Sequence, residues 1–293
     1  MEKIEKQTKE LLGSVISIEI EDEHANRIDK CFEIISNLEE KYSRFKPSST
    51  LSKLNEQIGN WQKVDEQTFE LLIRANELYE DTDGYFDITI KEILDSLGYD
   101  KDYSFKVKSN ESGIHKQLQR YEIDPITNEI KLLKQIDFGG FGKGLALDLV
   151  SNFLDENNVS HYLINAGGDI YAKRSKGMPA WKILLENPFE KDGNYIGIIE
   201  IDDFFIAGSG PNKRKWADSI HHLINPKTNL PQNENAGIFV IGQEGLVTDA
   251  FSTGLFVAGF EKGIELANKN GIDLFLISSD GKNYKSNNFP TLL

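Results

Sequence analysis

Between residues 137 and 148, the sequence DFGGFGKGLALD places four glycines around one lysine, Lys143. Residues 130–136 before it read as a strand, and apolar positions from Leu145 to Phe153 recur at the spacing of an amphipathic helix. Glycines at such a junction remove side chains that would keep a ligand off the backbone, so free N–H groups and the helix dipole can face an anion. The stretch therefore predicts a phosphate-binding turn, with an ordinary tight turn as the alternative.

Two familiar phosphate-binding loops do not match this stretch. A Walker A loop needs Gly six residues before the lysine and Ser or Thr after it, and those positions hold Asp137 and Gly144. The dinucleotide fingerprint needs a small residue to close the glycine run, but Leu145 and Leu147 occupy the two possible closing positions. Any anion site here is of another kind.

The charge of the chain limits its partners. Its 293 residues carry a formal net charge of −14 and no basic cluster, which disfavours a nucleic-acid or anionic-membrane surface. An anionic ligand must then be held by local groups or by a metal. With 39% hydrophobic residues the chain can build a large core, and no Pro- or Ser-rich linker divides it, so we expect one domain over 1–293.

Cys31 is the only cysteine, which excludes an internal disulfide and a cysteine-rich metal site. It falls on the apolar side of a predicted helix and is expected to be a buried thiol. Residues 1–12 are charged, and no apolar run has the length of a signal peptide or a membrane span. We expect a cytoplasmic protein without a transmembrane segment, although an exported or periplasmic protein whose leader had been removed would read the same.

The remaining pattern indicates many short strands and a few helices without a regular strand-helix repeat. This predicts an α+β fold with mainly antiparallel sheets flanked by helices. Residues 101–116 are polar and without periodicity, and we interpret them as a variable insertion. Strands are predicted at 13–20, 118–123, 129–133, 161–164, 181–186, 195–201, 204–207, 218–224, 237–241 and 272–277, and helices at 24–40, 65–80 and from 247 to 269 with a break at Gly259 or Gly263.

Two groups of side chains could support chemistry. Asp249 and Thr253 stand four residues apart at a predicted helix start, so their oxygens share one face and suit Mg²⁺, with an N-cap role for Asp249 as the alternative. His221 and His222 are adjacent on a predicted strand and point to opposite faces, so only one can enter a site. That histidine could act as a base, donate a hydrogen bond to a phosphate, or have only a structural role.

Seven short motifs occur in order along the chain. They are Ser49-x-Leu51-x-x-Leu54-Asn55, Gly84-x-Phe86-Asp87-x-Thr89, Asp137-x-Gly139-Gly140-x-x-Lys143-Gly144-x-Ala146-x-Asp148, Asn165-x-Gly167-Gly168-Asp169-Ile170, Ser209-Gly210, His222-x-Ile224-x-Pro226-x-Thr228 and Asp249-Ala250-x-Ser252-Thr253. Each is weak alone, but the ordered series resembles the ApbE family of FAD:protein FMN transferases over nearly the whole length.

This resemblance implies an ApbE-like α+β fold and a Mg²⁺-dependent reaction with FAD as substrate. The diphosphate of FAD would be split, FMN would be joined through a phosphoester to Ser or Thr of an acceptor protein carrying a flavinylation motif, and AMP would be released. Some members of the family instead hydrolyse FAD to FMN and AMP. A non-catalytic FAD-binding protein is a third reading.

The motif positions also imply roles for individual residues. The side chains of Asp249 and Thr253 and the carbonyl of Gly140 would bind the metal, and Lys143, Asp249 and His222 would be catalytic. His222 is the candidate for deprotonating the acceptor hydroxyl. The implied cofactor-binding positions are Phe45, which matches the flavin-stacking aromatic, Asn55, Tyr85, Phe86, Asp87, Asp137, Lys143, Asn165, Ser209, His222 and Leu223.

The chain departs from the usual family pattern at several positions, none of them a proposed metal ligand. Gly142 stands where Ala is more usual, Leu145 where Tyr is, and Ile88 where Pro is common. In the histidine motif, Asn225 and Asn229 replace Asp and Gly. These differences leave the orientation of the flavin and the acceptor contacts open.

Overall fold

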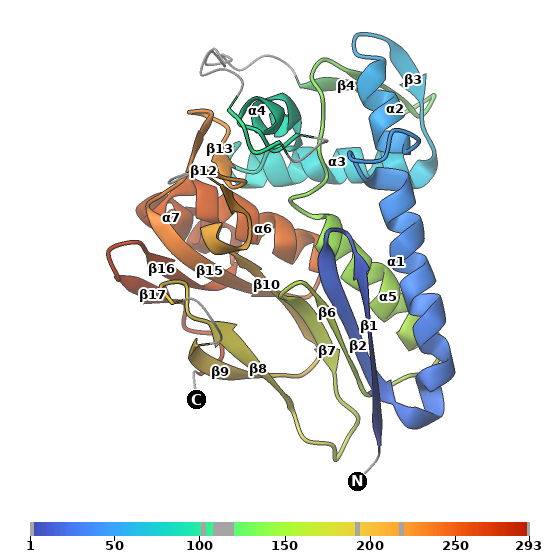
Figure 1. Cartoon of the computed structure of the whole chain (residues 1–293), viewed down its shortest axis with the longest axis vertical. Helices are drawn as coiled ribbons and strands as arrows, with labels where there is room; N and C mark the ends of the chain where they lie inside the picture. Colours follow the sequence, from blue (N-terminus) through green and yellow to red (C-terminus); the bar gives the residue numbers. More distant parts are fainter. Residues whose placement is uncertain (1–2, 101–103, 108–119, 191–193, 217–219, 292–293) are drawn as a thin grey trace.

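The computed structural model describes residues 3–100, 104–107, 120–190, 194–216 and 220–291. Within them, eight strands form one antiparallel sheet in the order β1-β2-β6-β7-β10-β15-β16-β17 (Figure 1). The strands are β1 (Ile4–Leu11), β2 (Ser14–Glu21), β6 (Tyr162–Ala166), β7 (Asp169–Lys173), β10 (Phe204–Ser209), β15 (Asn235–Gly242), β16 (Asp273–Ser278) and β17 (Asn283–Lys285).

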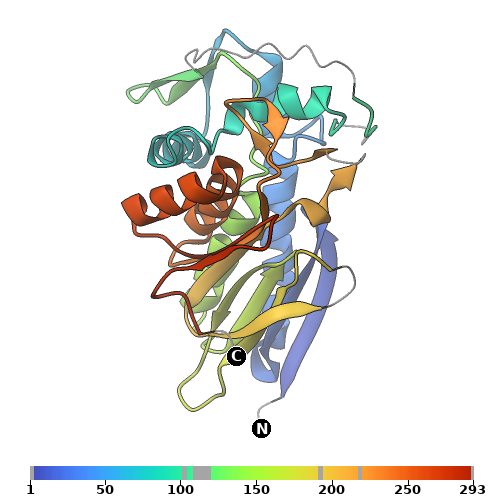
Figure 2. The same cartoon turned by 90° about the vertical axis from the view of Figure 1, so that its left-hand side faces the viewer.

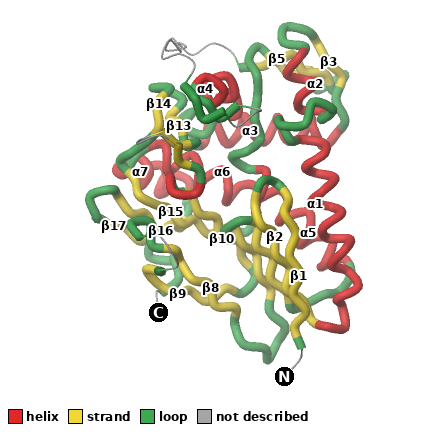
Figure 3. Tube along the Cα trace, viewed as in Figure 1, coloured by secondary structure: helices red, strands yellow, loops and turns green. Residues whose placement is uncertain are grey.

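Helices pack against one face of this sheet (Figure 3). Inward-facing positions of β2, such as Ile16 and Ile18, are fully buried, whereas Val15 between neighbouring strand positions is more than half exposed. This alternation is what a strand covered on one side requires. The helices are α1 (Ile28–Tyr42), α5 (Gly142–Glu156), α6 (Gly245–Ala258) and α7 (Phe260–Asn270), with α3 (Glu66–Asp81) beyond α6.

A hairpin covers part of the other face. Its strands are β8 (Trp181–Glu186) and β9 (Tyr195–Ile201), which pair antiparallel (Figure 2). Ile183 and Ile199 of the hairpin pack in one apolar cluster with Leu163 of β6, whereas Ile164, the next residue of β6, belongs to the helix-covered core. The sheet is thus buried on both sides over its middle strands.

Shorter elements gather at the upper end of the sheet in Figure 1. One is a three-stranded sheet in the order β3-β5-β4. Two further pairs, β11 with β12 and β13 with β14, flank the segment that holds His222. These elements are β3 (Trp61–Lys63), β4 (Tyr121–Asp124), β5 (Glu129–Leu132), β11 (Lys215–Trp216), β12 (Ile220–His221), β13 (Ile224–Asn225), β14 (Leu230–Pro231), α2 (Thr50–Glu56), α4 (Lys91–Ser96) and the 3₁₀ turns η2 (Ile88–Ile90) and η3 (Pro211–Lys213). A further 3₁₀ turn, η1 (Asp22–Arg27), joins β2 to α1 at the other end of the sheet.

The predicted α+β class with mainly antiparallel sheets is confirmed, as are most strands and helices. Asp65 caps α3 by accepting from Thr68 N–H at 3.1 Å. Gly259, with φ of 91°, breaks α6 from α7, because that backbone conformation is open mainly to glycine. No helix in the described ranges is both long enough and apolar enough to cross a membrane.

Several boundaries differ from the sequence prediction. Residues 4–11 were not predicted as a strand because they are highly charged, yet β1 pairs with β2 along its length, and Lys6 faces Glu19 at 2.7 Å. The strand expected at 130–136 ends at Leu132. The strand expected at 218–224 is wrong: β12 ends at His221 and β13 begins at Ile224. The predicted insertion at 101–116 lies mostly outside the described residues.

Candidate active site

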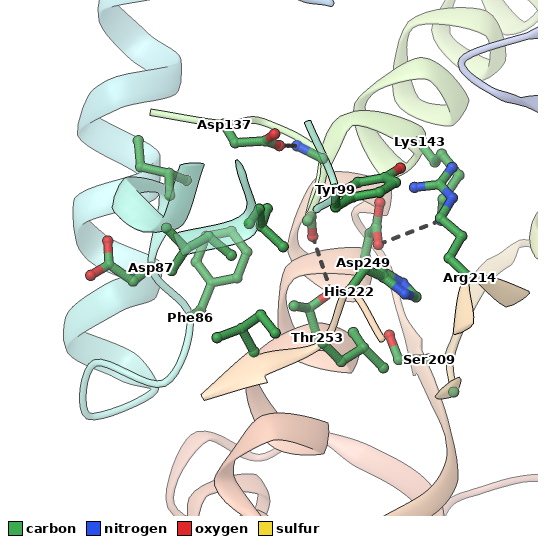
Figure 4. A pocket seen from close by; sticks show the side chains of 18 of the residues that line it. Phe86, Asp87, Tyr99, Asp137, Lys143, Ser209, Arg214, His222, Asp249 and Thr253 are labelled. Carbon is green, nitrogen blue, oxygen red and sulfur yellow. Dashed lines mark hydrogen bonds and ion pairs between the residues drawn. The ribbon is translucent and has the colours of Figure 1, made fainter. Parts of the chain in front are cut away.

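A cavity of about 200 Å³ opens where the glycine turn, α6 and the His222 segment meet (Figure 4). Its lining residues run from Gly13 to Thr253, and α5 and α6 begin side by side at this point. Among its lining residues are most of the positions predicted from the sequence: Tyr85, Phe86, Asp87, Asp137, Gly140, Lys143, Ser209, His222, Leu223, Asp249 and Thr253.

Two glycines bring the helices together. A Cβ placed on Gly144 would lie 2.1 Å from the carbonyl oxygen of Gly245, and one on Gly245 would lie 2.5 Å from that of Gly144. No side chain fits at either position. The glycine turn thus also serves as a contact between helices, which was part of neither the phosphate-binding prediction nor its tight-turn alternative.

This contact places Asp249 beside the glycine turn. Its Oδ2 accepts the backbone N–H of Gly144 at 2.9 Å, so that amide, predicted to be free for an anion, is already occupied. Asp249 is inside α6 and not its N-cap, which is Glu244, so the capping alternative is wrong. Burial raises the pKa of the Asp249 carboxyl, and the neighbouring Lys143 opposes that shift.

The three residues implied as metal ligands lie together. Thr253 stands one helical turn after Asp249, and its Oγ1 is 3.5 Å from the carbonyl oxygen of Gly140. The set offers one carboxylate, one hydroxyl and one carbonyl, which are hard oxygen donors of the kind that suit Mg²⁺. The donor chemistry therefore fits this ion.

Another acidic cluster lies elsewhere. In the described ranges, the one group of three acidic or histidine side chains with close ligand atoms is Glu21, Glu23 and His24. It sits at the opposite end of β2 from Ser14, which lines the cavity.

Lys143 is held by two carboxylates. Its Nζ contacts the Oδ2 of Asp169 and lies 3.8 Å from the Oδ1 of Asp249. Asp169, at the start of β7, is 1% exposed, and its Oδ1 accepts the N–H of Gly208 at 3.0 Å. Asp169 was part of a quoted motif but was given no role. The sequence could show its position, but not that β7 brings it to Lys143.

His222 lies between β12 and β13 and points into the cavity near Asp249 and Ser209 (Figure 4). Its Nδ1 has no hydrogen-bond partner among the described residues. Burial, with the nearby charge of Arg214, lowers the pKa of the imidazole to about 3. His222 is therefore neutral at pH 7. His221 is buried away from the site, and its Nδ1 accepts the N–H of Leu223 at 3.2 Å, so only one of the pair enters the cavity, as predicted.

Two other predicted residues, Phe86 and Asp87, support the wall of the cavity. Phe86 is buried and packs against Gly140 and Gly254. The carboxylate of Asp87 caps η2 by accepting from the N–H and the hydroxyl of Thr89 at 2.8 Å, and it points away from the cavity in Figure 4.

Nearer the cavity itself, two polar groups lie on its wall. The hydroxyl of Ser209 is 2.9 Å from that of Ser252 on α6. The ammonium of Lys227 lies over the ring of Tyr85, 3.8 Å from the ring centre.

Three predicted cofactor-binding residues lie outside this cavity. Asn55 is buried and exchanges two hydrogen bonds with the backbone of Ile136, at 2.8 and 2.9 Å, which fixes the chain before the glycine turn. Asn165 accepts the N–H of Gly168 at 2.8 Å in the β6–β7 turn. Neither side chain lines a described cavity, so both act on the backbone in this structure.

Phe45 lines a second cavity of about 370 Å³ beside the first. The two cavities meet along a row of residues common to both walls: Gly13, Tyr99, Asp137, Gly139, Lys143 and Arg214. Arg44, beneath this row, is nearly buried, and its Nε lies 2.7 Å from the Oδ2 of Asp137. Tyr99, Arg44 and Arg214 were not singled out from the sequence, since none belongs to a quoted motif.

The fold is that of ApbE proteins of known structure. Superposition on the ApbE protein of Thermotoga maritima gives a TM-score of 0.88 at 25% identity, covering 97% of both chains. The Pseudomonas stutzeri flavinyl transferase ApbE gives 0.83 at 25% identity, covering 98% of this chain and 96% of that one.

The sequence comparisons agree with the structural ones. The FAD:protein FMN transferase of Haemophilus influenzae is 27% identical over 263 residues, covering 83% of this chain and 76% of that protein. The Vibrio cholerae protein of the same name is 26% identical over 276 residues, covering 89% and 82%. The profile of the ApbE family matches residues 12–276. The chain belongs to the ApbE family.

Proposed function

We propose that this protein, an FAD:protein FMN transferase by family, splits the diphosphate of FAD with Mg²⁺ and attaches FMN to a Ser or Thr hydroxyl of an acceptor protein. One observation carries the proposal. Asp249, Thr253 and Gly140 line the first cavity together, and Asp249 lies beside Lys143, which stands on the boundary with the second cavity. A dinucleotide has two bulky ends joined by a diphosphate, and such a boundary is where its diphosphate would lie.

The residues that would hold Mg²⁺ are Asp249, Thr253 and Gly140. When bound, the ion would supply a Lewis acid that polarises a phosphoryl oxygen and offsets charge on the leaving phosphate. The protein's own contribution is to fix the ligands. The N–H of Gly144 holds the Asp249 carboxylate from one side, and Lys143 lies on its other oxygen.

The proposed transfer balances as a single displacement at phosphorus. The acceptor hydroxyl oxygen attacks the phosphorus of the FMN half, and the bond from that phosphorus to the bridging oxygen breaks. AMP leaves with the bridging oxygen, and the hydroxyl proton passes to His222. A neutral imidazole whose Nδ1 has no hydrogen-bond partner among the described residues is able to take that proton, and anionic phosphates beside it would raise its pKa from the low value that burial gives it.

An acceptor assay tests this function. The protein is incubated with FAD, Mg²⁺ and a peptide carrying the family's flavinylation motif, and a matched peptide with Ala in place of the target hydroxyl residue is the control. We expect mass spectrometry to show an FMN adduct on the first peptide only, with one AMP released per adduct. Free FMN and AMP without an adduct would indicate hydrolysis, and intact FAD after long incubation would indicate a carrier. Either result would contradict the proposal.

A further inference from the structure

The charges around Lys143 do not provide spare positive charge for an anionic ligand. Its ammonium lies between the carboxylates of Asp169 and Asp249, both nearly fully buried. One cation facing two carboxylates cannot by itself attract a diphosphate, whose own charge is negative. A second cation at the site is needed beside any metal.

Arg214 is a second cation at this position, and it pairs with no carboxylate of the described residues. It follows η3, is half-buried, and lines both cavities at their boundary. Its guanidinium carbon lies 5.8 Å from the centre of the Tyr99 ring, and its Nη2 reaches the β1–β2 turn at Gly13. Figure 4 shows the side chain extending toward Lys143 on the side of the cavity opposite Phe86.

Four other arginines pair with carboxylates. Arg44, Arg74 and Arg174 each have a carboxylate oxygen within 3.0 Å, and Arg120 has carboxylates at 4.0 Å. Within the described ranges no carboxylate lies within ion-pair distance of Arg214. Arg27 also has no carboxylate at ion-pair distance among the described residues, but it lies at the end of η1 and lines neither cavity. A half-buried guanidinium that stands at the cavity boundary next to another cation, with no counterion among the described residues, is a preorganised place for an anion.

We propose that Arg214 binds the diphosphate of the dinucleotide substrate. The identity of the ligand rests on the proposed function. The guanidinium has a planar fork of donors that matches two phosphate oxygens at once, whereas an ammonium is a point charge. Its place on the boundary row puts the fork where the two halves of a dinucleotide join. Arg214 therefore contributes to holding phosphate and not to recognising either the flavin or the adenine.

The test compares ligands with and without phosphate on the full chain. Isothermal titration measures FAD, ADP and riboflavin binding to the wild type and to Arg214→Gln, first with EDTA and then with Mg²⁺. We expect Arg214→Gln to bind FAD and ADP about 10- to 100-fold more weakly, since hydrogen bonds to charged groups are the strong ones. Riboflavin binding should change less than about twofold.

Two further variants make the result specific. Arg214→Lys keeps the charge but not the fork and should recover only part of the lost ADP affinity. Arg174→Gln removes a surface arginine that pairs with Asp202, and should bind all three ligands as the wild type does. Raising the salt concentration should weaken ADP binding to the wild type more than to Arg214→Gln.

Three outcomes would overturn the proposal. One is equal ADP and FAD affinity in the wild type and Arg214→Gln. Another is a parallel loss of riboflavin and ADP binding with a lowered melting temperature, because that would make Arg214 a structural residue. The third is a wild type that binds neither FAD nor ADP. Failure of the proposed function is separate: a wild type that binds FAD but transfers no FMN leaves the ADP comparison decisive.

Discussion

The carboxylate of Asp148 in α5 accepts the backbone N–H of Gly245, the first residue of α6, at 2.6 Å. Its second oxygen accepts the N–H of Leu246 at 2.7 Å. Asp148 thus satisfies two free amides at the start of the helix that carries Asp249, a task done in α2 and α3 by the N-cap residues Ser49 and Asp65. Asp148 therefore has a structural role at its motif position, because its carboxylate joins α5 to the start of α6.

Replacing Asp148 by Ala should destabilise the fold. We expect Asp148→Ala to lower the free energy of unfolding by about 1–2 kcal/mol, the usual cost of losing a capping side chain. Urea denaturation measures this. Asn152→Ala, an exposed change on the same helix, is the control and should stay within about 0.5 kcal/mol. Equal stability of the two variants would show that the cap is not needed.

Asp249→Asn should remove the charged ligand while keeping an oxygen that can accept from Gly144 N–H. We expect FMN transfer to fall by about 100-fold or more, because a metal ligand supports several kcal/mol of charge stabilisation. The stabilisation of the wild type by Mg²⁺, seen as a rise in melting temperature, should also be lost. A variant that retains both would mean that the metal is bound elsewhere.

Gly142 and Gly144 of α5 allow the steric need for glycine to be tested separately from its low helix propensity. Gly144→Ala should destabilise the protein by about 1–3 kcal/mol or prevent folding, since its Cβ would lie 2.1 Å from a backbone oxygen. Gly142→Ala meets nothing within 4 Å and should be neutral or stabilising by up to about 1 kcal/mol. Thermal unfolding distinguishes them, and similar melting temperatures would refute the close contact of α5 with α6.

The buried neutral His222 should make stability depend on acid pH. Its pKa is lowered from 6.5 to about 3 in the folded chain, so between these values the unfolded chain binds a proton that the folded chain does not. Its contribution to stability is therefore complete above pH 6.5 and declines as the pH falls toward 3. We expect the free energy of unfolding of His222→Gln to fall less steeply than that of the wild type between pH 6.5 and 4. Parallel curves in denaturant titrations would mean that the imidazole is protonated in the fold.

Much of the fold could be predicted because its strands and helices have local signals. The alternation in β2 and the capping of α3 by Asp65 depend on neighbouring residues and were visible in the sequence. The break between His221 and Ile224 was not, because its apolar residues continue a strand-like pattern while two short strand pairs divide it. Local pattern does not report a change of pairing partner.

The residues of the candidate site could be predicted from the sequence, but the contacts between them could not. The glycine pattern showed Gly144, but its partner Gly245 is a hundred residues away and has no motif of its own. Likewise, nothing local links Lys143 to Asp169. One departure from the family pattern is explained by geometry: Asn229 has φ of 59°, a left-handed conformation that Asn adopts more readily than most residues, so it can replace glycine there.

The site draws on residues from the glycine turn, from β7, from the His222 segment and from α6, so it is assembled only when these distant segments fold together. A fragment released by proteolysis ahead of α6 would keep Lys143 and Asp169 but lose Asp249 and Thr253. Such a fragment would lack two of the three oxygen groups that we propose hold Mg²⁺, and so would not support the proposed transfer.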